Sequence, residues 1–149
     1  MSSEPAPLDP QAAAQRAADA MYADDRASQA LGIVIDGVAP GAARAHMRIT
    51  GEMVNGHGIA HGGYIFLLAD TAFAFACNTH GATVAGGAEI VFVEPVREGE
   101  ELLAEAVERV SYGRSGVYDV TVRREDGDVV AEFRGHSRRL RTRDDAAPQ

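Results

Sequence analysis

A single carboxylate lies in the middle of a long apolar segment. Asp70 is the only acidic residue between His61 and His80, and most of its neighbours in that segment are apolar. Burying an unpaired carboxylate costs several kcal/mol or forces it to take up a proton. We therefore expect Asp70 to face a cavity, a subunit interface or a partner group, where it could act as a base or a nucleophile. The alternative is a structural aspartate, bonded to the neighbouring backbone or to Thr71.

A glycine-rich segment comes directly before this run. It reads Asn55-Gly56-His57-Gly58-Ile59-Ala60-His61-Gly62-Gly63. Glycines allow the backbone to approach a ligand closely, and the free N–H groups at a helix start carry a positive partial charge. Such N–H groups can stabilise a developing oxyanion. The alternative is a flexible loop with a glycine-rich helix start.

Helices and strands must hold these residues in place. The segment from Gly62 to Asn78 is too long for a strand and apolar on nearly every face, which predicts a buried helix. A cap candidate at Asp9, a proline after it and Gly32 past the end predict one surface helix from Asp9 to Gly32. Period-2 alternation predicts five or six strands, at Leu31–Asp36, Ala43–Thr50, Ala88–Val93, Leu102–Val110, Val117–Val122 and Val129–Ser137.

The connections define the fold class. Tight turns at 112–116 and at Asp126-Gly127 join neighbouring strands, which must therefore be antiparallel. The pattern predicts an α+β fold in which an antiparallel sheet wraps around one buried helix, with a short N-terminal helix outside it. We expect one domain over residues 10–142, with disordered tails at 1–9 and 143–149.

The spacing of the two candidate groups has a consequence for assembly. Gly62 and Asp70 are eight residues apart, which is about 12 Å along one helix. One chain cannot bring both to the same small substrate. Two antiparallel helices in a homodimer could place Gly62 of one protomer opposite Asp70 of the other, and the two-fold axis would then create two composite sites.

Composition excludes several classes of function. The chain has 149 residues, with 14 basic and 22 acidic side chains and a net charge of -8, which disfavours nucleic-acid binding. All basic residues are arginine, which excludes lysine chemistry, and the single Cys77 excludes an internal disulfide. His57 and His61 sit in a glycine loop with no further ligands, so we expect no metal and no cofactor. The absence of a long apolar span and of a signal peptide favours a cytoplasmic protein without membrane contact.

The central residues resemble those of a known family. The run from Asn55 to Gly63, then 68–74 and 76–78, strongly resembles the hot-dog-fold acyl-CoA thioesterases of the phenylacetate-degradation (PaaI) family. Further similarity covers 90–92 with Pro95, 113–114, 116–120 and 130–137, and in total about residues 25–140. The resemblance implies a hot-dog fold and hydrolysis of acyl-CoA thioesters, with (hydroxy)phenylacetyl-CoA or similar aryl and acyl thioesters as substrates.

The same resemblance implies roles for individual residues. In that family the acidic residue at the position of Asp70 is catalytic, the amide at the position of Gly62 polarises the thioester carbonyl from the partner subunit, and Asn55 and His61 help to build the pocket. A homodimer that pairs into a homotetramer is also implied. The residues expected to contact substrate are Gly63, Tyr64, Thr71, Gly113, Arg114 and Arg138.

Several alternatives stay open from the sequence. The basic cluster of Arg138, Arg139, Arg141 and Arg143 is either a site for the CoA phosphates or a solvated face. Tyr64, Phe66 and Phe73 could line an aromatic pocket or belong to the core. A non-catalytic acyl-CoA-binding protein would be expected to carry an effector segment. A hot-dog enoyl-thioester hydratase would be expected to carry a histidine five residues after Asp70, where this chain has Phe75, or else a histidine that acts with a glutamate of the partner.

Overall fold

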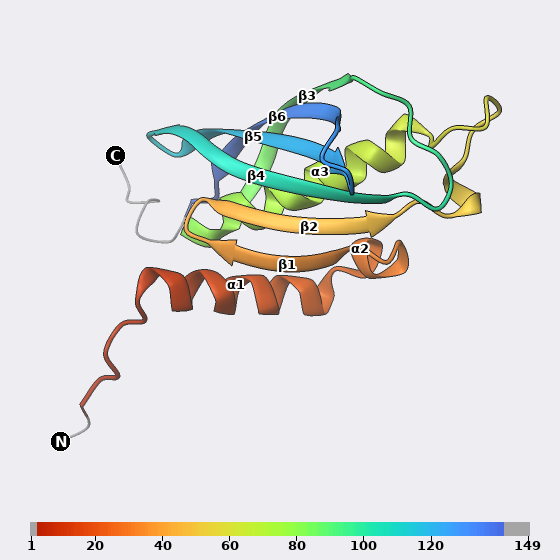
Figure 1. The fold of residues 1–149 in the computed structure, drawn as a ribbon. Helices are drawn as coiled ribbons and strands as arrows, with labels where there is room; N and C mark the ends of the chain where they lie inside the picture. The colour runs from red at the N-terminus through yellow and green to blue at the C-terminus, as the bar shows by residue number, and fades with distance from the viewer. Residues whose placement is uncertain (1–2, 142–149) are drawn as a thin grey trace.

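The computed structural model describes residues 3–141 and confirms an α+β hot-dog fold, in which one sheet wraps around one helix (Figure 1). All neighbouring strands are antiparallel, and the six run in the order β1-β2-β4-β5-β6-β3. Their bounds are β1 Val34–Ala39, β2 Ala42–Arg48, β3 Thr83–Phe92, β4 Glu101–Tyr112, β5 Ser115–Arg124 and β6 Val129–Arg139. The central helix α3 spans Gly62–Cys77.

The predicted alternation is confirmed on β2. Ala43, Ala45, Met47 and Ile49 are at most 2% exposed, because they point from the sheet towards α3. The two predicted tight turns are also present. Gly113 and Gly127 adopt φ values of +58° and +97°, a region that favours glycine.

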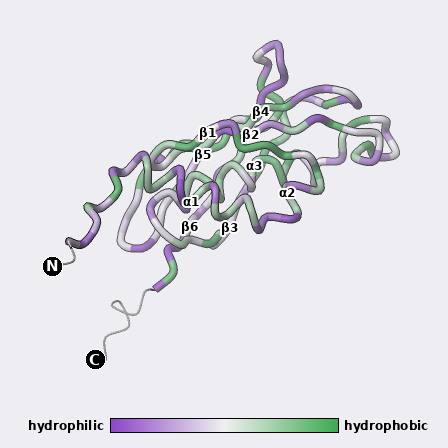
Figure 2. Tube along the Cα trace, turned by 90° about the horizontal axis from the view of Figure 1, so that it is seen from below, coloured by the Kyte–Doolittle hydropathy of each residue, from purple (hydrophilic) through white to green (hydrophobic). Residues whose placement is uncertain are grey.

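Helix α3 forms the centre of the core. Nine of its 16 residues are buried, and Figure 2 shows hydrophobic chain next to the α3 label in the middle of the molecule. A close approach to β6 depends on Gly135, where a Cβ atom would lie 2.8 Å from ring carbons of Phe73. A larger residue at position 135 would therefore push the helix away from the sheet.

The prediction of one continuous N-terminal helix from Asp9 to Gly32 is wrong, because the helix is interrupted at one residue. The structure has α1 (Pro10–Asp24) and α2 (Arg26–Ala30), separated at Asp25. The Asp25 carboxylate accepts a hydrogen bond from the N–H of Ser28 at 3.0 Å and caps α2. Aspartate bonds to nearby backbone groups in non-helical conformations, so it starts a new helix here. Helix α1 lies alongside β1 (Figure 1).

Two strands begin three or more residues away from their predicted starts. Strand β1 begins at Val34, three residues later than predicted, because Gly32 still forms a turn with φ of +71°. Strand β3 begins at Thr83, five residues earlier than predicted. Gly86 and Gly87 carry no side chains that could show the alternation, and the register shifts between Ala85 and Gly87.

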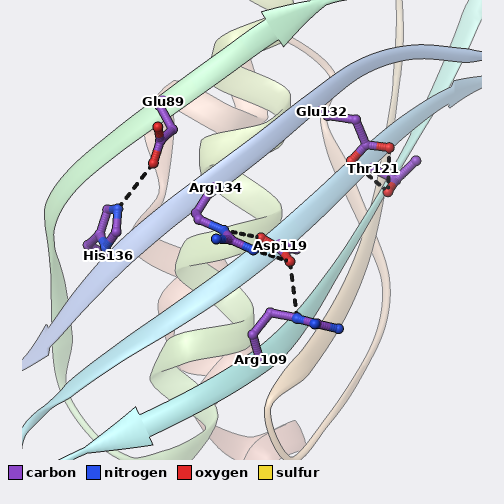
Figure 3. A network of polar contacts seen from close by, with 7 residues as sticks. All are labelled: Glu89, Arg109, Asp119, Thr121, Glu132, Arg134 and His136. Atoms are coloured by element: carbon purple, nitrogen blue, oxygen red, sulfur yellow. Dashed lines mark hydrogen bonds and ion pairs between the residues drawn. The ribbon is translucent and has the colours of Figure 1, made fainter.

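The outer face of the sheet carries a cross-strand polar network (Figure 3). The Asp119 carboxylate on β5 accepts hydrogen bonds from Arg134 on β6 at 2.7 and 3.0 Å and pairs with Arg109 on β4 at 3.3 Å. Hydrogen bonding from Arg134 holds the pKa of Asp119 below its usual range. Glu89 on β3 pairs with His136 at 3.4 Å on this same face. These side chains bridge the strands on the face opposite α3.

The segments outside the domain are only partly described. Residues 3–9 contain no helix or strand. The predicted tail at 143–149 lies outside the described residues, so disorder of both tails stays a prediction.

Short 3-10 turns at Gly51–Met53 and Asn78–His80 precede and follow the segment that holds α3.

Candidate active site

The loop before α3 orients the side chain of Asn55. Its Oδ1 accepts hydrogen bonds from the backbone N–H groups of His57 at 2.9 Å and Ile59 at 3.4 Å. The loop is closed by the Asn55 N–H, which donates to the carbonyl of Ile59 at 2.8 Å. Because Oδ1 is held by two donors, Nδ2 must point away from them. Asn55 can therefore offer an N–H donor to a ligand.

His61 is the N-cap of α3 and decides which glycine amide is free. Its Nδ1 accepts a hydrogen bond from the N–H of Gly63 at 3.0 Å, so the neutral ring carries its proton on Nε2. The first N–H groups of a helix have no partner inside it. Within residues 3–141 no hydrogen bond uses the N–H of Gly62. Gly62 therefore presents the donor, whereas Gly63 uses its own N–H inside the protein.

A cavity of about 440 Å³ opens beside Gly62. Its polar lining comes from Asn55, Gly62 and Glu94. The apolar lining consists of Ile59, Ala60, Ile65, Phe92, Val93, Pro95 and Val96. Its volume is within the range of about 300–1,000 Å³ that is typical of small-molecule sites. The structure thus brings two of the predicted site residues, Asn55 and Gly62, to one cavity.

Phe92 is the aromatic residue of this cavity, and it was not among the predicted site residues. It ends β3, its side chain is 51% exposed, and a Cβ atom on Gly62 would lie 2.8 Å from Cζ of Phe92. A signal was present in the sequence. Ile90 and Phe92 are two residues apart on one strand and so share the face towards α3.

The aromatic residues on α3 line no part of the cavity. Phe73 is 1% exposed and packs against Phe133 at a centroid distance of 5.8 Å. Phe66 also packs against Phe133, at 5.4 Å. Tyr64 lies edge-on to His61 at 6.3 Å. Phe73 is therefore a core residue, Phe66 is partly buried against the core, and Tyr64 packs on the cap of the helix.

Asp70 is half-buried in the middle of α3. Burial raises the pKa of its carboxyl above the ordinary value, and no hydrogen bond or opposite charge offsets this effect within the described chain. The alternative partner, Thr71, is 6% exposed, and its Oγ1 lies 3.3 Å from Oγ of Ser28. Thr71 therefore sits in the core behind Asp70, away from the cavity at Gly62. Asp70 has the properties of a functional carboxylate without a structural partner.

One chain does not bring Asp70 to Gly62. Helix α3 is continuous from Gly62 to Cys77, so the two residues are about 12 Å apart along its axis. Asp70 is also absent from the lining of the cavity at Gly62. A single protomer thus holds two donors at one place and the carboxylate at another.

A second cavity, of about 370 Å³, lies at the other end of α3. Its lining includes Gly113, Arg114 and Arg139, together with three serines, at 111, 115 and 137. The structure does not place Arg138 there. Ser137 and Arg139 share the inward face of β6, so Arg138 points to the opposite face. The structure therefore places Arg139, and not the predicted Arg138, in the lining of this cavity, and Arg143 lies outside the described residues.

Cys77 also reaches this second cavity but is not a nucleophile. Burial raises the pKa of its thiol to about 12, and the residue is 3% exposed. The reactive form of cysteine is the thiolate. Cys77 therefore stays protonated and packs as a core residue.

Comparison with known proteins agrees with this geometry. Residues 57–131, which include both Gly62 and Asp70, match the model of the family described as the thioesterase superfamily. The acyl-coenzyme A thioesterase PaaI of Escherichia coli (strain K12) is 44% identical over 124 residues, covering 83% of this chain and 89% of that protein. The chain belongs to the thioesterase superfamily. The expected hot-dog fold and the expected class of thioester hydrolase are therefore confirmed.

Solved structures of thioesterase-superfamily relatives superpose along most of the chain. The structure of the E. coli PaaI protein from the phenylacetic acid degradation operon has a TM-score of 0.87 and 41% identity, covering 89% of this chain and 97% of that one. A mutant of the phenylacetic acid degradation protein PaaI from Thermus thermophilus has a TM-score of 0.76 and 38% identity, covering 78% of this chain and all of that one (100%). The predicted resemblance to PaaI proteins is confirmed.

Two further observations concern metal binding and membrane-spanning helices. In the part of the chain that the structure describes, no cluster of three or more His, Cys, Asp or Glu side chains is placed to hold a metal ion. None of the helices within residues 3–141 combines the length and apolarity needed to cross a membrane.

Proposed function

We propose that this protein hydrolyses acyl-CoA thioesters at sites formed by two protomers. The observation that carries the proposal is the separation of the two halves of the site. Gly62 and Asn55 present donors at one cavity, and the unpartnered Asp70 lies about 12 Å along the same helix. A second copy with its α3 antiparallel would supply Asp70 to the cavity at Gly62, and the two-fold axis would create the reciprocal site.

The chemistry of such a site is acyl transfer to water. The N–H of Gly62 and Nδ2 of Asn55 would donate to the thioester oxygen as it becomes an oxyanion. Asp70 of the partner protomer would either take a proton from the attacking water or attack the carbonyl carbon itself. The C–S bond then breaks, and CoA leaves as a thiolate that takes up a proton. On the second route, water hydrolyses the resulting anhydride and regenerates Asp70.

Two exposed features support a dimer in which a second copy contacts the β3 edge of the sheet and the half-buried side of α3. Strand β3 is at the edge of the sheet, and Val91 and Val93 are 64% and 50% exposed. An unpaired apolar edge of this length is a template for pairing with another strand. On α3 a stripe of Gly63, Leu67, Asp70 and Ala74 is only half-buried or exposed, at helical spacing. A second copy would cover both, and pairing of two such dimers would give the homotetramer.

The second cavity suits the nucleotide end of the substrate. Phosphates need local positive charge in a protein whose net charge is -8. Arg114 and Arg139 supply it, together with serine hydroxyls as hydrogen-bond donors. Glu108 also lines this cavity, and its carboxylate is bound by Nε2 of His80 at 2.7 Å. In the antiparallel dimer this cavity of one protomer would lie beyond its Asp70, near Asn55 of the other. For the acyl end we propose (hydroxy)phenylacetyl or a similar aryl or acyl group, and a cytoplasmic location.

No observation favours the alternative functions. Phe75, where a hydratase would need a histidine, is 2% exposed and packs in the core. A protein that only binds acyl-CoA has no need for a half-buried carboxylate without a structural partner.

Release of free thiol from a panel of acyl-CoAs tests the proposal. The panel contains phenylacetyl-, hydroxyphenylacetyl-, benzoyl- and aliphatic acyl-CoAs. The wild type is expected to hydrolyse at least one of them, and Asp70→Asn none at a comparable rate. Asp128→Asn, at an exposed turn, is the matched control and should retain full activity. Binding of acyl-CoA without thiol release by the wild type would favour the non-catalytic alternative.

A further inference from the structure

The cavity at Gly62 has one apolar wall and one charged group. Glu94 is the only charged residue in its lining. The backbone on either side is anchored, because the N–H groups of Val93 and Glu94 both donate to the carbonyl of Val130, at 2.8 and 3.3 Å. Val96 is fully buried. The segment that presents Phe92 and Glu94 is therefore held against β6, and the Val96 carbonyl, which accepts the N–H of Ala60 at 2.7 Å, ties it to the loop before α3.

Phe92 fills the space next to the free amide. Its Cζ would be 2.8 Å from a Cβ atom on Gly62, so the tip of the ring lies over the start of α3. The ring is half-exposed, and it is on the α3 side of β3, whereas Val91 points to the outer face. A group that binds beside the Gly62 N–H must therefore contact the Phe92 ring.

Glu94 and Glu89, the acidic residue on β3, have different surroundings. Glu89 pairs with His136 on the outer face of the sheet (Figure 3). Glu94 lines the cavity and takes part in no salt bridge within residues 3–141. A carboxylate in this position repels a second carboxylate and places no penalty on an uncharged group.

We propose that this cavity receives the acyl group, that the Phe92 ring sets the size it accepts, and that Glu94 rejects acyl groups ending in a carboxylate. This inference rests on the proposed thioesterase function and adds its substrate class: uncharged, predominantly apolar acyl groups. The shared part of all acyl-CoA substrates, the pantetheine and nucleotide, lies outside this cavity.

The role of Phe92 is tested by comparing kcat/KM across acetyl-, hexanoyl- and phenylacetyl-CoA. In Phe92→Ala the ratio of kcat/KM for the largest to the smallest acyl group should rise at least about tenfold, because one methylene in an apolar pocket already changes selectivity by about that factor. Phe92→Leu should give a smaller change in the same direction. Val107→Ala, at an exposed valine of β4 away from this cavity, is the control and should leave the ratio unchanged. An equal change for every acyl group would mean that the cavity holds pantetheine, and would overturn the proposal.

The role of Glu94 is tested with a charged and an uncharged acyl group of similar length. Glu94→Gln should raise kcat/KM for glutaryl-CoA relative to hexanoyl-CoA at least about tenfold, since a like charge has been removed from the site. Glu125→Gln, at an exposed turn, makes the same change in net charge and should have no effect on the ratio. Glutarate should also become a better competitive inhibitor of the Glu94→Gln enzyme.

The two proposals fail in different ways. If the wild type hydrolyses hexanoyl-CoA but neither ratio changes in the variants, the acyl group binds elsewhere and only this inference is wrong. If the wild type hydrolyses no acyl-CoA, the proposed function is wrong and this inference falls with it.

Discussion

Nδ1 of His61 accepts the N–H of Gly63 at 3.0 Å, and this bond leaves the neighbouring Gly62 N–H as the donor at the start of α3. The histidine therefore serves the site through the backbone, by fixing the first turn of the helix. Its own imidazole is exposed and edge-on to Tyr64.

Replacing the cap tests this positioning role. His61→Ala should lower the free energy of unfolding by about 1 kcal/mol, as loss of an N-cap does, and should lower kcat more than it changes KM. His61→Asn, which can cap the same N–H, should recover most of both losses. Denaturant unfolding and steady-state kinetics measure the two effects. A His61→Asn protein that is stable but as inactive as His61→Ala would instead assign the imidazole a direct catalytic role.

Removing the carboxylate of Asp70 should lower the activity without lowering the stability of the fold. Asp70→Asn is expected to lower kcat at least about 100-fold, the scale of losing an acid or base group. Its free energy of unfolding near neutral pH should equal or exceed that of the wild type, because burial penalises the ionised carboxylate. Kinetics and denaturant unfolding are measured on the same preparation. Wild-type turnover by a folded Asp70→Asn protein contradicts the assignment.

The raised pKa of Asp70 predicts a specific pH dependence. The reaction needs the ionised form, so kcat/KM should fall as the pH drops through this pKa, at a higher pH than for an exposed carboxyl group. Between the pKa values of the unfolded and folded states the folded protein binds more protons, so the free energy of unfolding falls as the pH rises. In Asp70→Asn the contribution of this carboxyl group should be absent from the pH dependence of kcat/KM and from that of the free energy of unfolding. An acid limb that Asp70→Asn retains would belong to another group.

Mixing two inactive variants tests whether the site is shared. In hybrid dimers of Asp70→Asn with Gly62→Pro, one of the two sites would combine an intact Gly62 with an intact Asp70. Random exchange should then restore about a quarter of wild-type activity, since half of the dimers are hybrid and each has one working site. Proline fits at this first helical position, because His61 before it has an extended backbone, and the exposed Phe92 ring can move aside. Confirmed subunit exchange without recovery would place the site within one chain.

The two neighbouring arginines of β6 give an internal control for CoA binding. Arg114→Glu and Arg139→Glu should raise KM for acyl-CoA much more than they change kcat, as loss of uniform binding does. Arg138→Glu, on the opposite face, should have little effect. Truncated thioesters without the nucleotide should respond to none of these changes. If KM is unchanged in all three variants, the phosphates bind elsewhere.

The parts of this protein that could be predicted from sequence depend on short-range patterns. The lone carboxylate of Asp70, the glycines before α3 and the alternation along β2 all lie within single elements, where side-chain direction follows from a local period of 2 or 3.6 residues. The same patterns gave the central helix nearly to its last residue. Errors arose where a pattern was interrupted, at Asp25 between two helices and at the paired glycines of β3.

The contacts between elements were decided only by the tertiary structure. Arg138 and Arg139 have the same charge and adjacent positions, but one residue of register sends their side chains to opposite faces, and only strand pairing sets that register. Phe92 meets Gly62 across 30 residues of chain because the end of β3 packs against the start of α3. The sequence by itself determined which groups could do chemistry. Packing determined which of them share a cavity, because a cavity is bounded by segments whose separation along the chain carries no information about their distance in space.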